Sequence, residues 1–418
     1  MTGTTIAGFF DDLTVVEIAD RRNQYVGKLL ADGGARVIQI EPLHGSGGRH
    51  VGPFVADQPD PNRSLDYWYY NAGKQSVCID IDRPAGATLV SRLVAQADLF
   101  LESRLQDTLA AADLDYATNE ARNGRLLQVS LTDFGQDGPW RDYLANDVAH
   151  LALGGQMASS GYSEPDVTPI GGQGHQAWHI AGALCMTSIM AALIERLTSG
   201  RGQYIDCSIH DCASICTEQA IPAWTYAGQV LYRNTGQHAS VRRAAPSNIK
   251  AADGRWVNVV ATQLTPPLWA NILAWMVELG VEGELASPEY HDEVHRALRW
   301  REGSEIQEGM TRILARVNGY DAMHRAQGFG LTWSVVQAPE ENYELAHWQQ
   351  RNSFVPIDQP GAPKSVRMPR GPYLIEGTPF QPRAAAPALG ADTDAVLTAL
   401  LGCSQAELSA FRESKVIG

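Results

Sequence analysis

The sequence predicts an α/β protein with a doubly wound, mostly parallel sheet and a smaller inserted α+β domain. Three observations carry this prediction. Short apolar segments alternate with helical segments along the N-terminal third, the first three of these segments form one strand–helix–strand unit, and the character of the chain changes near residue 226.

The first unit consists of two strands joined by a helix. The segment 13–19 (LTVVEIA) is short, β-branched and flanked by charged residues, which is typical of a buried strand. Apolar residues at helical spacing then occupy 24–33, and Gly33 ends that helix. The segment 35–42 is a second apolar strand, closed by Pro42. Because a helix joins the two strands, we expect a right-handed parallel crossover.

The same alternation continues along the chain. Strands are predicted at 76–81, 98–103 and 125–131, and a helix is predicted at 85–97. No G-x-G-x-x-G follows the first strand, so the fingerprint of dinucleotide binding is absent.

Beyond these segments the sequence predicts a long helix and then a mixture of strands and helices. A long helix is expected after Ala181, up to the break at 199–203, and another strand follows in YIDCSI. The segment 244–261 predicts a hairpin around an Asp-Gly turn, before tryptophan-rich helices. We therefore place a small domain at 226–330.

Composition limits the class of partner. The 418 residues include 33 Lys plus Arg against 47 Asp plus Glu, a formal net charge of −14, which works against long polyanions such as nucleic acid. A small anionic ligand held by a few local cations stays open. The N-terminal residues lack the features of a signal peptide, and the apolar run 180–194 is too short for a membrane span. Six cysteines without a C-x-x-C pair indicate a reducing compartment, so we expect a cytoplasmic protein.

Two histidines, His175 and His179, raise the question of a metal site. Their spacing is that of H-E-x-x-H zinc motifs, but Gln176 stands where that motif has its glutamate base, and no third ligand is evident. We favour ordinary hydrogen-bonding histidines, so no metal is assigned. Cys207, His210, Cys212 and Cys216 also lie close together in the sequence, but their spacing matches no common zinc or iron–sulfur pattern. We interpret the cysteines as buried, inert thiols and assign no metal to them.

Two segments offer groups for binding a phosphate. Glycines at positions 45, 47 and 48 precede Arg49, so the backbone could wrap an anion while Arg49 supplies charge. Lys74 precedes the strand at 76–81. Spacing alone is weak evidence for either site. A glycine-rich surface loop after a strand is common, and a lysine before a strand is usually solvated.

A series of motifs resembles the class III CoA-transferase family (CaiB/BaiF type), which includes formyl-CoA and carnitine-type transferases. The matching stretches are LLADGGARVIQIEP, NAGKQSVCIDI, ADLFLES, the FGQDGP turn, NDVAHLALGG, AALIERLTSGRGQYIDCSI, APSNIKAADGRWVNV and LGADTDAVLTALLG. They run nearly from end to end, and their order is more specific than any single stretch.

The resemblance implies both a fold and a ligand. Family members have a large Rossmann-like domain built from both chain ends, here 1–225 plus 331–418, with the small domain 226–330 inserted, and two subunits form an interlocked dimer. Coenzyme A or its acyl thioester is a substrate, with no further cofactor, and lies near the carboxyl ends of the strands. The implied CoA-contacting residues are Glu41, Pro42, Arg49, Lys74, Ile79, Asp80, Ile81, Asp82, Ser103 and Arg104.

At ESRLQD (102–107) the chain departs from the family pattern, which usually has asparagine and then an aromatic residue, proline and glycine. A second departure concerns the nucleophile. Moving CoA between carboxylic acids needs an enzyme carboxylate that attacks the thioester, forms a mixed anhydride and then carries CoA as an enzyme thioester. In the family this is an aspartate four residues before the glycine that opens the long helix.

That glycine matches Gly182, because the eighteen-residue spacing to Gly200 is preserved, and four residues back stands Trp178. An indole offers no nucleophile, so the catalytic residue stays unassigned. Asp166 would restore a carboxylate only through a rearranged loop. The inserted domain also has aromatic residues that suit either a bulky acyl group or an ordinary core, namely Trp224, Tyr226, Tyr232 and Trp269.

Three hypotheses follow from Trp178. Some family enzymes have two unlike subunits of which one retains the aspartate, so the chain fits the aspartate-lacking subunit in CoA transfer between carboxylic acids. It also fits a non-catalytic homodimer that binds acyl-CoA. The third hypothesis is another acyl-CoA activity, hydrolysis or isomerisation, with His175 or His179 as the general base.

Overall fold

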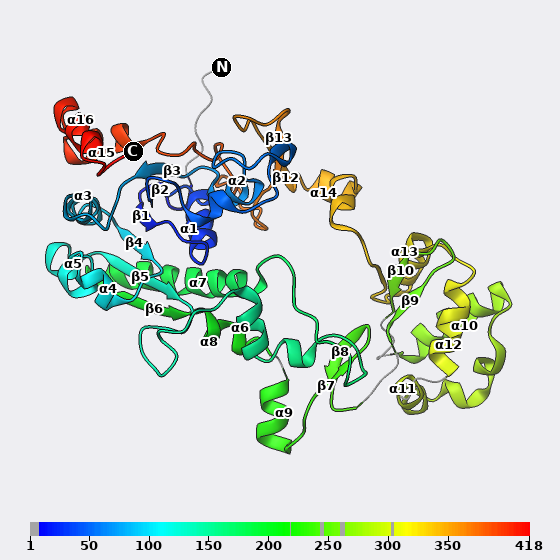
Figure 1. Cartoon of the computed structure of the whole chain (residues 1–418). Helices are drawn as coiled ribbons and strands as arrows, with labels where there is room; N and C mark the ends of the chain where they lie inside the picture. Colours follow the sequence, from blue (N-terminus) through cyan, green and yellow to red (C-terminus); the bar gives the residue numbers. More distant parts are fainter. Residues whose placement is uncertain (1–7, 218, 243–245, 260–263, 302–304) are drawn as a thin grey trace. The chain divides into compact units, whose positions relative to one another are not determined.

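The computed structural model describes residues 8–217, 219–242, 246–259, 264–301 and 305–418. The chain folds into two compact units. The first comprises Met1–His150, Gly174–Ala213 and Tyr343–Gly418, and the second comprises Leu151–Gln173 and Ser214–Asn342. Segments from both halves of the sequence therefore build the first unit, which contains the central sheet (Figure 1). The domain bounds at residues 226 and 330 stay a prediction.

A six-stranded parallel sheet of order β3-β2-β1-β4-β5-β6 forms the centre of the first unit. This order confirms the predicted doubly wound sheet, because the chain moves outward from β1 in one direction and from β4 in the other. Burial on both faces explains why β1 to β5 are rich in apolar residues. The strands are β1 (Thr14–Ile18), β2 (Arg36–Glu41), β3 (Gln75–Cys78), β4 (Leu99–Glu102), β5 (Leu127–Thr132) and β6 (Tyr204–Ser208).

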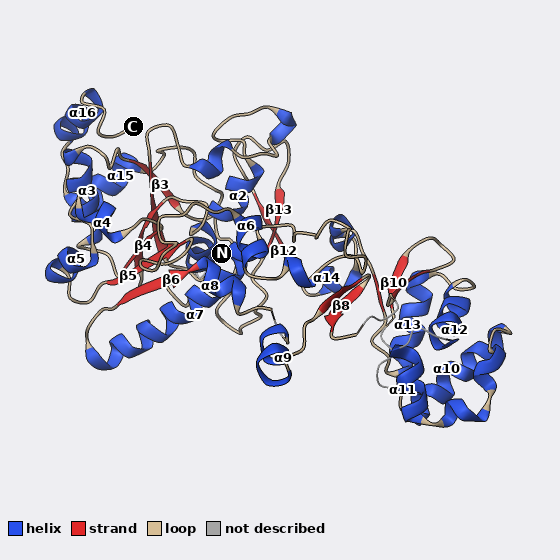
Figure 2. Cartoon of the chain, turned by 60° about the horizontal axis from the view of Figure 1, so that its bottom comes forward, coloured by secondary structure: helices blue, strands red, loops and turns tan. Residues whose placement is uncertain are grey.

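Helices surround this sheet (Figures 1 and 2). Local signals explain where several of them begin: Pro84 opens α3, and a capping box of Ser404 and Glu407 opens α16. The helices that lie in or begin in the first unit are α1 (Gln24–Asp32), α2 (Leu65–Asn71), α3 (Pro84–Val94), α4 (Gln106–Ala110), α5 (Tyr116–Arg122), α6 (Asp147–Leu153), α7 (Gln176–Ser199), α8 (Ile209–Ser214), α14 (Ala346–Gln350), α15 (Thr393–Leu401) and α16 (Gln405–Glu413).

The C-terminal end of the chain completes the core on one side of the sheet. Leu93 of α3 belongs to the same buried cluster as Ile38 of β2, Leu397 of α15 and Leu408 of α16. Immediately after β3, Ile79 forms a bridge with Ile417. A separate antiparallel pair, β12 (Phe354–Ile357) and β13 (Val366–Pro369), also belongs to this unit.

Helix α7 begins at Gln176, six residues before the expected start after Ala181, and His175 takes the left-handed conformation at its N-cap. Gly182 allows α7 to approach α1 closely, since a Cβ atom there would lie 2.8 Å from Cδ1 of Tyr25. By length and composition α7 could cross a membrane, but 44% of its apolar window is buried inside the protein.

The second unit combines helices with small antiparallel sheets around a tryptophan-rich core. Trp269, Trp275 and Trp333 are among its largest buried side chains. The predicted hairpin appears as β9 and β10, with Gly254 in its turn, while the ends of the segment 244–261 lie outside the described residues. The elements are α9 (Ala220–Ala227), β7 (Tyr232–Asn234), β8 (Gln237–Ser240), β9 (Asn248–Lys250), β10 (Trp256–Asn258), α10 (Pro266–Leu279), α11 (Glu293–Arg301), α12 (Glu305–Leu314), α13 (Gly319–Phe329) and β11 (Ser334–Val335).

Candidate active site

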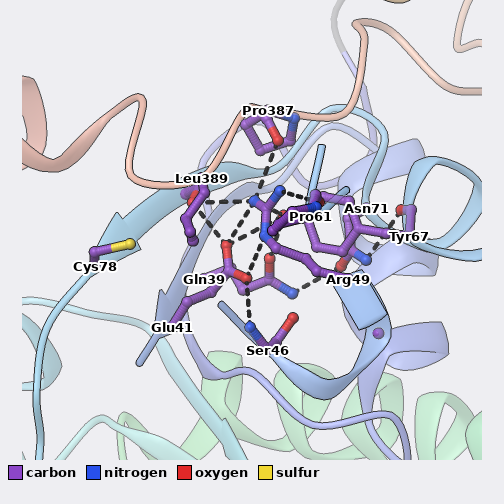
Figure 3. Close-up of polar contacts among 12 residues, drawn as sticks. Gln39, Glu41, Ser46, Arg49, Pro61, Tyr67, Asn71, Cys78, Pro387 and Leu389 are labelled. Atoms are coloured by element: carbon purple, nitrogen blue, oxygen red, sulfur yellow. Dashed lines mark hydrogen bonds and ion pairs between the residues drawn. The ribbon is translucent and has the colours of Figure 1, made fainter. Parts of the chain in front are cut away.

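Arg49, expected to hold a phosphate, lies in a closed polar cluster (Figure 3). Its guanidinium donates from Nε to Oε2 of Glu41 at 2.7 Å and from one terminal nitrogen to Oε1 at 2.8 Å, and both side chains are fully buried. The same terminal nitrogen reaches the hydroxyl of Tyr67 at 2.5 Å, and the other donates to Oδ1 of Asn62 at 3.1 Å. Burial alone would raise the pKa of Glu41, but hydrogen bonds and charge from Arg49 hold that pKa below its usual value.

Lys74 is enclosed in the same way. Its ammonium donates to Oε2 of Glu17 at 2.8 Å and to the carbonyl of Gln24 at 3.1 Å, and neither charged side chain reaches solvent. Neither Arg49 nor Lys74 is accessible in the described structure, so we assign both a structural role in place of the predicted phosphate contact. Each cation neutralises a carboxylate that the strands would otherwise bury without a partner.

An open cavity of about 620 Å³ lies elsewhere in the first unit, between α3 and the segment that follows β4. Three of the predicted CoA contacts line it: Ile81, Asp82 and Arg104. Helix α3 supplies one wall, and α4 and α5 supply another. The cavity is also bordered by Arg83, Arg92 and Arg122, so guanidinium groups outnumber its two carboxylates. This is a local excess of positive charge in a protein whose formal net charge is −14.

Two of the cavity arginines, Arg83 and Arg104, are less enclosed than Arg49. Arg104 lies 3.8 Å from Oδ1 of Asp82, and its side chain is 35% exposed. Arg83 donates to Oδ2 of Asp80 at 3.1 Å and is 49% exposed. Exposed guanidinium groups in a concave site suit phosphate, which they bind through paired N–H donors.

The remaining predicted contacts lie around this region without lining the cavity. Ser103 is buried, and its Oγ has no hydrogen-bond partner among the described residues. Ile79 is buried in the core, Asp80 pairs with Arg83, and Pro42 is exposed after β2. Arg83, Arg92 and Arg122 were not among the residues predicted from the sequence. Helical spacing could have pointed to Arg92, because Pro84, Thr88, Arg92 and Ala95 are three or four residues apart and so lie on one face of α3 and its C-cap.

Trp178, at the position where the resemblance places the family nucleophile, lies in the first turn of α7. Its indole is 7% exposed and stacks on the ring of His175 at 4.9 Å between centroids. The guanidinium of Arg21, directly after β1, lies 5.1 Å from the indole centroid, within the range of a cation–π contact. The backbone N–H of Trp178 donates to Oδ1 of Asp147 at 3.1 Å, while its indole Nε1 has no partner among the described residues.

The two histidines point to different partners. Nε2 of His175 lies 3.3 Å from a terminal nitrogen of Arg21 and 3.5 Å from Oδ1 of Asp66. Nε2 of His179 lies 2.7 Å from the hydroxyl of Tyr70. Burial, followed by the charge of His175, lowers the pKa of His179, so its imidazole is neutral at pH 7. The structure brings no cluster of three His, Cys, Asp or Glu ligands together within the described residues.

Two carboxylates lie near Trp178, but neither takes the place of a side chain at position 178. Asp147 is buried and accepts the N–H of Trp178, and Asp66 faces His175. Asp166 is exposed and belongs to the second unit. An indole cannot attack a thioester, so Trp178 itself supplies no nucleophile.

The family model for CoA-transferase family III matches residues 11–393. The chain belongs to this family. Among its relatives, the succinyl-CoA:(R)-benzylsuccinate CoA-transferase subunit BbsE of Thauera aromatica is 28% identical over 93% of both chains. Two more come from Chloroflexus aurantiacus: the succinyl-CoA–D-citramalate CoA-transferase, 28% identical over 97% of this chain and 98% of its own, and the beta subunit of the succinyl-CoA–L-malate CoA-transferase, 25% identical over 100% of each.

A solved structure supports the fold of this family III chain. The crystal structure of a CaiB/BaiF family protein from Brucella suis superposes with a TM-score of 0.78 at 24% identity, covering 96% of this chain and 100% of that one. The likeness extends over the whole length.

Proposed function

We propose that the chain is the acyl-CoA-binding subunit of a heteromeric CoA-transferase whose nucleophilic carboxylate resides on a sibling family III chain. Trp178 carries this proposal. The chain retains the length and fold of the family, and yet an indole occupies the position at which the resemblance places the aspartate. Relatives whose names include "subunit" support a role of this kind.

We place the nucleotide half of CoA in the 620 Å³ cavity. Arg83, Arg92, Arg104 and Arg122 would neutralise its phosphates, and the cavity lies after β3 and β4, where open α/β sheets bind ligands. In this proposal Ile81, Asp82 and Arg104 keep their predicted role as CoA contacts.

Exposed apolar side chains support a protein partner. Helix α9 is apolar, but none of its residues is buried, and Trp224 and Tyr226 are 63% and 90% exposed. On α7, Ile194 and Leu197 also face solvent. Apolar surface of this kind marks a protein interface. We propose that in an interlocked dimer a sibling chain covers the exposed residues of α9 in the second unit and those of α7 in the first.

In such a dimer the two chains divide the work. This chain holds CoA, and Trp178, packed against His175 and Arg21, supplies no carboxylate. The sibling's carboxylate attacks the thioester carbon and releases CoA thiolate as the mixed anhydride forms. The thiolate then attacks the enzyme carbonyl of the anhydride, which frees the first acid and leaves an enzyme thioester that the acceptor acid opens.

A turnover assay tests the proposal. We expect the purified chain to transfer no CoA from succinyl-CoA to a panel of dicarboxylic acids, whereas coexpression with an adjacently encoded sibling that has aspartate at the Trp178 position restores transfer. Changing that aspartate to alanine is the matched control. Substantial transfer by this chain alone would contradict the heteromer.

The same assay separates the two other hypotheses. A non-catalytic homodimer predicts CoA binding and no turnover with any sibling. Hydrolysis or isomerisation predicts acyl-CoA consumption by the chain alone, with loss in His175→Ala or His179→Ala.

A further inference from the structure

Glu102 is a buried carboxylate at the end of β4, where the strand order of the sheet reverses. Its side chain is inaccessible to solvent. It accepts the backbone N–H of Arg104 at 2.6 Å, the side-chain N–H of Gln106 at 3.3 Å and the hydroxyl of Ser130. The carboxylate therefore binds the start of the loop that carries a cavity arginine.

The loop is held from other elements as well. Arg22, after β1, donates to the carbonyl of Ser103 at 2.8 Å. Gln136 donates to the carbonyl of Arg104 at 3.0 Å and accepts the N–H of Gln106 at 2.9 Å. Because the backbone of Arg104 is bonded through both its nitrogen and its oxygen, the direction in which its side chain leaves toward the cavity is determined.

Few charges stabilise the ionised form of Glu102. Burial is the largest influence and raises its pKa to about 7, although hydrogen bonds from Ser130, the Arg104 backbone and Gln128 and the positive charge of Arg22 act in the opposite direction. Tyr204 of β6 also faces this group, with its hydroxyl donating to Oγ of Ser130 at 2.9 Å. The carboxyl group therefore changes charge in the neutral range.

We propose that Glu102 is a positioning residue for CoA binding, whose carboxylate holds the 103–106 loop so that Arg104 faces the ligand. This proposal rests on the proposed CoA site. It concerns ESRLQD, the segment in which the chain departs from the family pattern. The ionised carboxylate accepts the Arg104 N–H through a charge-assisted bond, and protonation weakens that bond and frees the loop.

Calorimetric titration with free CoA tests the role of Glu102. Glu102→Gln mimics the protonated form at every pH. We expect this variant to bind CoA about fivefold more weakly than the wild type at about pH 8 and equally at about pH 6, because only the charge-assisted part of the bond is lost. In an Arg104→Ala background, the same substitution should change nothing. Glu164→Gln, an exposed substitution in the second unit, is the matched control.

Each other outcome overturns a defined statement. A constant ratio of dissociation constants at both pH values would show a merely structural Glu102. Tighter binding by Glu102→Gln would show that charge repulsion outweighs positioning. If Arg104→Ala binds CoA like the wild type, the proposed CoA site itself fails. If Arg104→Ala weakens binding while Glu102→Gln does not, the positioning role alone fails.

Discussion

Arg49 and the arginines of the cavity belong to the same unit, and they differ in what surrounds them. Arg49 is fully buried and donates hydrogen bonds to Glu41, whose carboxylate is fully buried as well. The cavity arginines border open space, and Arg83 and Arg104 remain 49% and 35% exposed. The same side chain thus stabilises the fold in one place and is available to a ligand in the other. The arrangement of counter-charges decides between the two.

Removing Arg49 should have the greater consequence for folding. Arg49→Ala leaves Glu41 charged and buried without its partner, so we expect the free energy of unfolding to fall by about 3–5 kcal/mol. Urea unfolding followed by circular dichroism measures the loss. In the same experiment Arg104→Ala should cost less than about 1 kcal/mol, because Arg104 is paired only at the surface. Equal losses in the two variants would remove the distinction drawn above.

Glu102 extends this contrast to a carboxylate. Its pKa in the folded protein, about 7, lies above the value of 4.5 for a free glutamate, so folding favours its protonated form. Stability from this group is complete below pH 4.5 and is lost as the pH rises to about 7. Glu102→Gln should therefore be more stable than the wild type at about pH 8, by up to about 3 kcal/mol, and similar at about pH 5. Thermal unfolding measured across this pH range tests the prediction. A difference in unfolding temperature between the two proteins that does not change with pH would contradict it.

Sequence reasoning located the strands and missed the counter-charges. Short, mostly apolar segments identified the six strands of the sheet, because burial of five of them along nearly their whole length leaves a local signal. The partner of Lys74 is Glu17, 57 positions away, and no spacing rule pairs them. Trp269 and Trp224 look alike in the sequence, although the first is core and the second is 63% exposed. The start of α7 follows His175, which is left-handed, and a histidine in the sequence does not predict that conformation.

The cavity arginines should matter for binding rather than for folding. We expect Arg104→Ala to raise the dissociation constant of CoA about tenfold to a hundredfold, the effect of losing one charge-assisted hydrogen bond to phosphate. Calorimetry measures this change. Dephospho-CoA as a second ligand shows which phosphate Arg104 serves, and an unchanged constant for both ligands would place the phosphates elsewhere.

The identity of the nucleophile can be tested by mapping covalent adducts. The complex with the sibling chain is incubated with succinyl-CoA and hydroxylamine, which converts an enzyme anhydride or thioester into a stable hydroxamate, and both chains are then analysed by peptide mass spectrometry. We predict a hydroxamate on the sibling's aspartate and none on any Asp or Glu of this chain. A hydroxamate on Asp66 or Asp147 would show that this chain supplies its own nucleophile beside Trp178.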